Sequence, residues 1–127
     1  MQLQALIGGH PHTCGTGLSL AEAARAMHAA GVGSVGVVAD KDLIGILTER
    51  DLMRAVAAGA DMDLEMVTDW MSAPVQTFDA ETSVDEAALQ LLEREQRHLP
   101  VVSDGKVIAI LSIRDILAAL IEPDRRS

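Results

Sequence analysis

Two short segments of this chain place a hydroxyl, an arginine and an aspartate in the same order. They are Thr48-Glu49-Arg50-Asp51 and, 64 residues later, Ser112-Ile113-Arg114-Asp115. A carboxylate can accept hydrogen bonds from both hydroxyls of a ribose, and a hydroxyl with an arginine can hold a phosphate group. A helix that begins at each segment would add oriented N–H groups for an anion. The set therefore suits a nucleotide.

A helix cap is the simpler interpretation of each segment. The hydroxyl would accept a backbone N–H at the helix start, and an acid in the first turn is favoured by the helix dipole. Such motifs are common, but a cap does not need an arginine. The hydroxyl, the arginine and the aspartate recur at the same spacing directly after an apolar run, which favours a binding role in addition to the cap.

The two segments belong to an internal repeat that needs no gap. A duplicated unit normally packs on its copy around a pseudo-twofold axis, which creates paired clefts where a ligand could sit. The repeat therefore bears on the architecture and on the place of a binding site. The identical pairs include Thr13 and Thr77, Ser19 and Ser83, Glu22 and Glu86, and Asp40 and Asp104.

The pattern of each half predicts a strand, a helix, two strands and a second helix, in that order. Capping boxes at Ser19-x-x-Glu22 and Ser83-x-x-Glu86 predict the start of the first helix in each half. Apolar residues follow at i, i+3, i+4 and i+7, which is one helical face. Unbroken apolar runs predict buried strands at 35–38, 43–47, 99–102 and 107–111. We expect an α/β (α+β) fold of two pseudo-twofold-related repeats packed through small sheets.

The segment between the halves predicts a short amphipathic helix. Its apolar positions are Leu64, Val67, Trp70 and Met71. The repeat offset maps Val67 onto Leu3, so the N-terminal segment is expected to be a shortened copy of this helix. Because each half is small, the halves are expected to share one core. The expected boundaries are 1–58 for the first repeat with its N-terminal helical segment, 59–74 for the linker, 75–122 for the second repeat and 123–127 for a polar tail.

Composition narrows the class of partner. The formal charge of −9 over 127 residues argues against nucleic acid or an anionic membrane, since both require a basic surface. The sequence lacks an apolar run long enough for a spanning helix and a signal-peptide pattern. Cys14 is the only cysteine, which excludes an intrachain disulfide. These features predict a cytoplasmic protein.

The chain resembles a tandem pair of cystathionine β-synthase (CBS) domains, a Bateman module. The resemblance covers nearly the whole chain. It implies a homodimer and a regulatory role in which adenosine ligands such as AMP, ADP, ATP or S-adenosylmethionine occupy two clefts related by the pseudo-twofold axis. The motifs that carry it are Gly45-Ile46-Leu47-Thr48-Glu49-Arg50-Asp51, Ala109-Ile110-Leu111-Ser112-Ile113-Arg114-Asp115, Arg97-His98-Leu99-Pro100-Val101-Val102 and Val67-Thr68-Asp69-Trp70-Met71-Ser72.

The resemblance also implies roles for individual residues. Asp51 and Asp115 would hold the two riboses. The phosphates or the sugar would contact the flanking hydroxyls and arginines, which are Thr48, Arg50, Ser112 and Arg114. Further contacts would come from the opposite repeat, in segments 13–18, 32–34, 77–82 and 96–98. The candidates in those segments are Thr13, Ser34, Thr77, Arg97 and His98.

The two halves differ at a position that matters for charge. Where the second half has Arg97-His98-Leu99-Pro100, the first has Gly33-Ser34-Val35-Gly36. Gly15-Thr16-Gly17 likewise stands where the second half has Asp79-Ala80-Glu81. We therefore expect two sites of unequal affinity.

Other functions are weaker interpretations. His10, His12 and Cys14 alternate and could face one side of a strand as metal ligands. No separate Cys/His pair completes a zinc pattern, so we interpret them as incidental and expect no metal. No nucleophile with a base and an orienting acid is evident, so we expect neither an enzyme nor a catalytic cofactor. A ligand-free dimerising scaffold stays open, and in either case the output would pass to a separate, unidentified protein.

Overall fold

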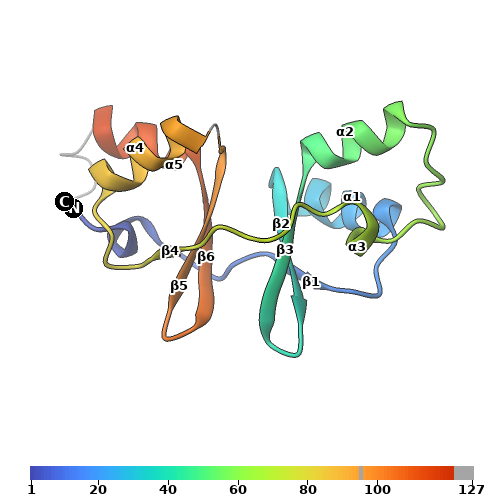
Figure 1. Cartoon of the computed structure of the whole chain (residues 1–127), viewed down its shortest axis with the longest axis horizontal. Helices are drawn as coiled ribbons and strands as arrows, with labels where there is room; N and C mark the ends of the chain where they lie inside the picture. Colours follow the sequence, from blue (N-terminus) through green and yellow to red (C-terminus); the bar gives the residue numbers. More distant parts are fainter. Residues whose placement is uncertain (95, 122–127) are drawn as a thin grey trace. The chain divides into compact units, whose positions relative to one another are not determined.

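The computed structural model describes residues 1–94 and 96–121 (Figure 1). The polar tail expected at 123–127 lies outside the described residues. The chain folds into two units, which we name by the repeat that each contains. The first-repeat unit is Pro11–Val75, and the second-repeat unit combines Met1–His10 with the chain from Gln76 onward.

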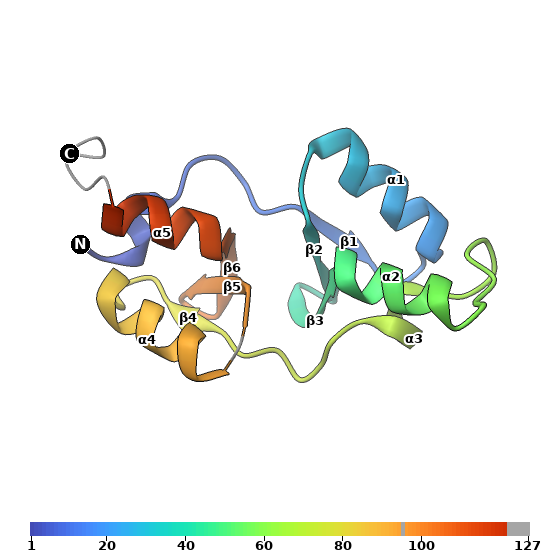
Figure 2. The same cartoon turned by 90° about the horizontal axis from the view of Figure 1, so that it is seen from above.

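The first-repeat unit has a three-stranded mixed sheet in the order β1-β2-β3. β1 runs parallel to β2, and β2 runs antiparallel to β3. Helices α1 and α2 lie on the same face of this sheet (Figure 2). The elements are β1 (Thr13–Gly15), α1 (Leu20–Ala30), β2 (Ser34–Ala39), β3 (Asp42–Thr48), α2 (Glu49–Ala57) and α3 (Val67–Trp70).

The second-repeat unit repeats this pattern, with β4 parallel to β5 and β5 antiparallel to β6. The register is also repeated, since Ser34 pairs with Thr48 in one unit and His98 with Ser112 in the other. The predicted order of strand, helix, strand, strand and helix is confirmed in both halves. The elements are the 3-10 helix η1 (Leu3–Leu6), β4 (Phe78–Asp79), α4 (Val84–Arg94), β5 (His98–Ser103), β6 (Lys106–Ser112) and α5 (Ile113–Ile121).

Local sequence signals determine where the first helix of each half begins. Ser19 and Glu22 form the complete capping box before α1, and Gly31 ends that helix in the left-handed conformation with φ of 69°. Ser83 Oγ accepts the backbone N–H of Glu86 at 3.1 Å before α4. The predicted helix starts are therefore confirmed. In the part of the chain that the structure describes, no helix has both the length and the apolar character that crossing a membrane requires.

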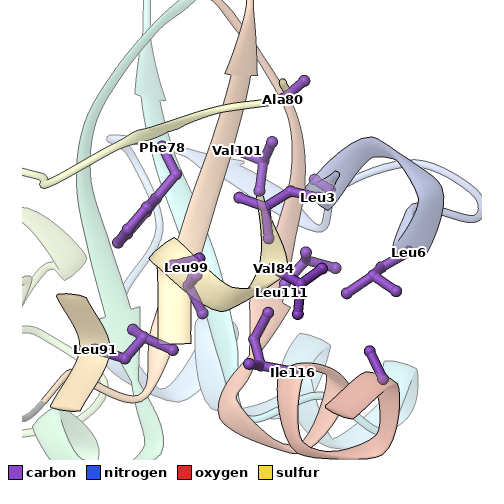
Figure 3. Close-up of a cluster of buried hydrophobic side chains, with 13 residues drawn as sticks. Leu3, Leu6, Phe78, Ala80, Val84, Leu91, Leu99, Val101, Leu111 and Ile116 are labelled. Carbon is purple, nitrogen blue, oxygen red and sulfur yellow. The ribbon is translucent and has the colours of Figure 1, made fainter. Parts of the chain in front are cut away.

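Among the residues that the structure describes, the buried apolar side chains form two clusters, one in each unit. The expectation of one shared core is therefore wrong. Each small repeat gains apolar area from a segment that lies outside its own strand-helix-strand-strand-helix sequence. In the second-repeat unit that segment is η1, and Figure 3 shows the side chains of Leu3 and Leu6 gathered with those of Val101 and Leu111.

The segments that precede the two repeats are exchanged between the units. η1 precedes the first repeat but packs in the second-repeat unit, where Leu3 N–H donates to the Thr82 carbonyl at 2.8 Å. α3 precedes the second repeat but packs in the first-repeat unit, where Val67 N–H donates to the Leu18 carbonyl at 3.0 Å. These bonds are equivalent at the repeat offset. The N-terminal segment is thus a copy of the linker helix, but it is not shortened, since η1 and α3 have four residues each. The chain crosses between the units twice.

The linker helix is shorter than its apolar pattern suggests. α3 has four residues and buries Val67, while Trp70 and Met71 pack against the same core. Leu64 is 74 % exposed, so its expected place on the buried face is wrong. It lies in a turn in which its N–H donates to the Asp61 carbonyl, before α3 begins.

The exchange makes a prediction about stability. Leu3 is fully buried, so Leu3→Ala is expected to lower the free energy of unfolding by about 2–4 kcal/mol through lost transfer energy and a residual cavity. The matched control Leu64→Ala removes the same atoms from an exposed position and should change it by less than about 0.5 kcal/mol. Urea unfolding followed by circular dichroism measures both. Equal effects of the two substitutions would contradict the role assigned to η1.

Candidate functional site

The motif around Asp51 lies at the junction where β3 becomes α2. Thr48 is the last residue of β3 and the N-cap of α2. Asp51 N–H donates to Thr48 Oγ1 at 3.2 Å, and Thr48 N–H donates to Asp51 Oδ2 at 2.9 Å. The helix-cap interpretation is therefore correct, and the cap also fixes the position of the carboxylate.

The motif around Asp115 has the same geometry between β6 and α5. Ser112 N–H donates to Asp115 Oδ2 at 2.8 Å, and Asp115 N–H donates to Ser112 Oγ at 3.3 Å. In both motifs the hydroxyl also donates to the same carboxylate oxygen, at 3.0 Å from Thr48 and 3.1 Å from Ser112. One carboxylate oxygen of each aspartate is thus used by the cap.

The second carboxylate oxygen distinguishes the two aspartates. Asp51 Oδ1 accepts from Arg54 Nη2 at 2.8 Å and from Ser72 Oγ at 3.3 Å, and Asp51 is only 4 % exposed. Asp115 is half-buried, and its Oδ1 accepts no hydrogen bond from the residues that the structure describes. The repeat offset places Ala118 where Arg54 stands. Asp115 can therefore accept a further donor, whereas Asp51 has both oxygens engaged.

Ser72 reaches Asp51 because its backbone pairs with the edge of the sheet. Ser72 N–H donates to the Ile46 carbonyl at 2.8 Å, and Ile46 N–H donates to the Ser72 carbonyl at 3.1 Å. Gly45 makes room for this segment, since a Cβ there would overlap the side chain of Met71. The counterpart of Ser72 at the repeat offset is Gly8, which has no hydroxyl to offer Asp115.

The structure places two of the other candidate residues beside the motif of their own repeat, although the resemblance implied that they contact the ligand of the opposite repeat. Ser34 is buried and lies opposite Thr48 in the sheet, and His98 lies opposite Ser112. Thr13 on β1 pairs with Gly36 on β2, and Gly36 is two residues after Ser34 on that strand. Thr77 directly precedes β4. The arginines Arg50, Arg97 and Arg114 have exposed side chains. The ligand contacts expected of these residues stay predictions.

Glu49 is a charged neighbour of the first motif that the sequence did not single out. Its N–H donates to the Gly33 carbonyl at 2.9 Å, and its carboxylate folds over the same glycine. A Cβ on Gly33 would lie 3.3 Å from Glu49 Oε1. At the equivalent positions of the second motif, Ile113 N–H donates to the Arg97 carbonyl at 2.8 Å. The two motifs therefore share a backbone arrangement but differ in local charge.

Sequence reasoning also missed the partners of Asp51. Arg54 lies three residues after Asp51 on one helix, and this spacing alone signals a side-chain pair. Ser72 had no such signal, because it is 21 residues away and is brought in by the pairing with β3. The asymmetry predicted from Gly33 and Arg97 thus extends to the second oxygen of each aspartate.

The alternating His10, His12 and Cys14 do not assemble into a larger ligand cluster. Among residues 1–94 and 96–121, no group of three or more His, Cys, Asp or Glu side chains could hold a metal ion. Cys14 lies half-buried in β1, and burial raises the pKa of its thiol. The thiol is therefore less reactive at neutral pH than the thiol of a fully solvent-exposed cysteine.

The different partners of the two aspartates predict different costs of removal. Asp51→Ala removes the cap acid, a half-exposed ion pair and the bond from Ser72, and should lower the free energy of unfolding by about 2 kcal/mol. Asp115→Ala removes the cap acid alone and should cost about 1 kcal/mol. Urea unfolding of both variants measures the difference. A larger loss from Asp115→Ala would contradict this account.

A family model described as "CBS domain" matches residues 7–58 and 67–122. An uncharacterized protein of Methanopyrus kandleri is 42 % identical over 99 residues, which cover 76 % of this chain and 50 % of that protein. A 17.7 kDa protein of Acidianus ambivalens is 36 % identical over 83 % of this chain and 64 % of its own length. The chain thus spans between half and two thirds of the length of these relatives.

Solved structures of other CBS proteins match the fold of this chain over nearly its whole length. A CBS-domain protein of Agrobacterium tumefaciens is 33 % identical with a TM-score of 0.88, and the match covers 94 % of this chain and 99 % of that one. A CBS domain protein of Pyrobaculum aerophilum, complexed with AMP, is 27 % identical with a TM-score of 0.85 over 95 % of this chain and 98 % of its own.

A third structure shares the fold at lower identity. The CBS domain pair of protein MJ0100, in complex with 5′-methylthioadenosine and S-adenosyl-L-methionine, is 22 % identical with a TM-score of 0.87. The match covers 98 % of each chain. The family model, the internal repeat and these folds agree: this chain belongs to the CBS domain family and carries two CBS domains in tandem, a Bateman module.

Proposed function

We propose that this chain is a regulatory module that binds an adenosine-containing ligand and signals to a separate protein. The candidate ligands are AMP, ADP, ATP and S-adenosylmethionine. The CBS domain protein of Pyrobaculum aerophilum is complexed with AMP, and the CBS domain pair of MJ0100 with 5′-methylthioadenosine and S-adenosyl-L-methionine. These complexes support the choice of adenosine compounds as candidates. The free energy available for signalling is the difference in ligand affinity between two states of the protein.

The observation that carries the proposal is the second carboxylate oxygen of Asp115. It is held at the start of α5 by the cap, and it accepts no hydrogen bond from the described part of the chain. A ribose diol could donate to it without displacing a protein group. Arg114 and Arg97 supply positive charge beside the same motif, and the α5 N-terminus adds a favourable field for phosphate.

Asp51 is a poorer ribose acceptor by the same reasoning. A ribose that binds there competes with Arg54 and Ser72 for Oδ1. Breaking a half-exposed ion pair and one hydrogen bond costs on the order of 1 kcal/mol, which is about fivefold or more in affinity. We therefore propose that the Asp115 motif contributes the tighter site, and that Asp51 contributes the weaker one.

Self-association is the second part of the proposal. The second helix of each repeat exposes apolar side chains that a homodimer could bury, namely Met53 and Val56 on α2 and Leu117 and Leu120 on α5. α4 adds Leu89 and Leu92, which replace Arg25 and His28 of the first repeat and which the sequence reading did not single out. Exposed apolar helical faces of this kind are typical of association surfaces. They also favour the alternative function, a dimerising scaffold without a ligand.

Ligand binding is tested by calorimetry with AMP, ADP and ATP, after a thermal-shift panel that adds S-adenosylmethionine and divalent metals. The wild-type protein should bind at least one adenosine compound. Asp115→Ala should weaken the tighter binding event at least tenfold, because the free carboxylate oxygen is lost. Asp51→Ala should leave that event within about threefold.

The outcomes separate the competing functions. Equal losses from the two variants would contradict the proposed asymmetry. No shift with any adenosine compound would overturn the nucleotide-binding proposal and leave the scaffold. A shift with zinc or copper alone would instead indicate a metal-responsive protein that uses His10, His12 and Cys14.

Self-association is tested by size-exclusion chromatography with light scattering at micromolar concentration. The wild-type protein should have twice the 13.5 kDa mass of one chain. Met53→Glu or Leu120→Glu places a charge on an apolar face that the dimer would bury, and should shift the protein toward the monomer. Leu64→Glu, at an exposed turn, is the matched control and should stay dimeric. A monomeric wild-type protein refutes the dimer.

A further inference from the structure

The two motifs can be compared position by position because their backbones make the same hydrogen bond. The carbonyl of Gly33 accepts the first helical N–H of α2, from Glu49. The carbonyl of Arg97 accepts the first helical N–H of α5, from Ile113. Residue 33 therefore corresponds to residue 97, and residue 49 to residue 113, in space as well as in sequence.

At these corresponding positions the charges are of opposite sign. In the second motif, a basic side chain leaves the backbone at residue 97, and an apolar residue begins the helix. In the first motif, the place next to the Gly33 backbone is taken by the carboxylate of Glu49, whose two oxygens lie 3.3 and 3.5 Å from where a Cβ would stand. Because Gly33 has no side chain, this carboxylate lies directly against its backbone.

The remaining charges near each motif do not cancel this difference. At the first motif, Arg54 is paired with Asp51, which leaves Glu49 and Arg50 as the other charged side chains of the turn. At the second motif, Arg97 and Arg114 accompany Asp115, and position 118 is an alanine. Within its own repeat, the Asp115 motif is accompanied by two arginines, whereas the Asp51 motif is accompanied by one unpaired arginine and a carboxylate.

We propose that Glu49 is a specificity-determining residue, which makes the Asp51 motif select adenosyl compounds without a phosphate group. The Asp115 motif would take the phosphorylated ligand. This inference rests on the proposed function and deepens it by assigning a ligand class to each motif. The carboxylate of Glu49 repels a phosphate and also occupies the field of the α2 N-terminus that would otherwise attract one. An uncharged or cationic substituent on the ribose meets no such repulsion.

The experiment isolates the Asp51 motif in an Asp115→Ala background and measures the dissociation constants of adenosine and AMP by calorimetry. The background protein should bind adenosine more tightly than AMP. Adding Glu49→Gln should improve AMP binding about three- to tenfold, as expected for one charge removed several ångströms away, and change adenosine binding less than twofold. Glu93→Gln, on the exposed face of α4, removes the same charge elsewhere and should alter neither.

Several results would overturn the inference. They are a background protein that prefers AMP, one that binds neither compound, and a ratio of the two constants that Glu49→Gln changes less than twofold. If the wild-type protein binds no adenosine compound, the proposed function fails as well. If it binds and only the ratio is unaffected, the assignment to Glu49 alone fails.

A converse variant keeps the test independent of the stability of the background protein. Ile113→Glu, in the otherwise wild-type chain, places a carboxylate at the corresponding position of the second motif. It should weaken AMP binding at the Asp115 motif about three- to tenfold, with adenosine binding nearly unchanged. Unchanged AMP binding would count against the proposal.

Discussion

The exchange of the segments that precede the two repeats is the constraint on which the rest of the structure depends. Each repeat is small, and its core is completed by Leu3 or by Val67 from outside its own strands and helices. The linker that delivers Val67 continues to Ser72, which pairs with the edge of β3. Packing of the core and the surroundings of Asp51 are therefore set by the same stretch of chain.

Different residues at equivalent positions make the two motifs unequal although their caps and the exchange are alike. The linker brings a hydroxyl to Asp51, whereas the N-terminal segment has Gly8 at the corresponding position. Arg54 adds a pair on the helix that Ala118 cannot provide. A duplicated motif can in this way keep the hydrogen bonds of its helix cap while the partners of the second carboxylate oxygen differ between the copies. Both carboxylate oxygens of Asp51 accept hydrogen bonds from protein groups, whereas Asp115 has an oxygen that a ligand could use.

The cap explains why the structural and the binding interpretations of the motif are compatible. A carboxylate that accepts a backbone N–H and a hydroxyl is held in one orientation, so a second oxygen beside it is presented at a defined place. Pre-organisation of this kind reduces the entropy that a ligand must offset on binding. The proposed selection by charge then depends on residues next to the frame, such as Glu49 and Arg97, and not on the frame itself.

The sequence by itself determined the repeat, the order of elements, the helix starts at Ser19 and Ser83, and the position of both motifs, because these follow from local hydrogen bonding and apolar periodicity. It also predicted the charge difference between Gly33 and Arg97. Only the tertiary structure decided that the buried residues form two cores, that Leu64 is exposed, and that Ser72 reaches Asp51. Those features depend on contacts between residues distant in the chain, for which a single sequence has no periodic or local signal.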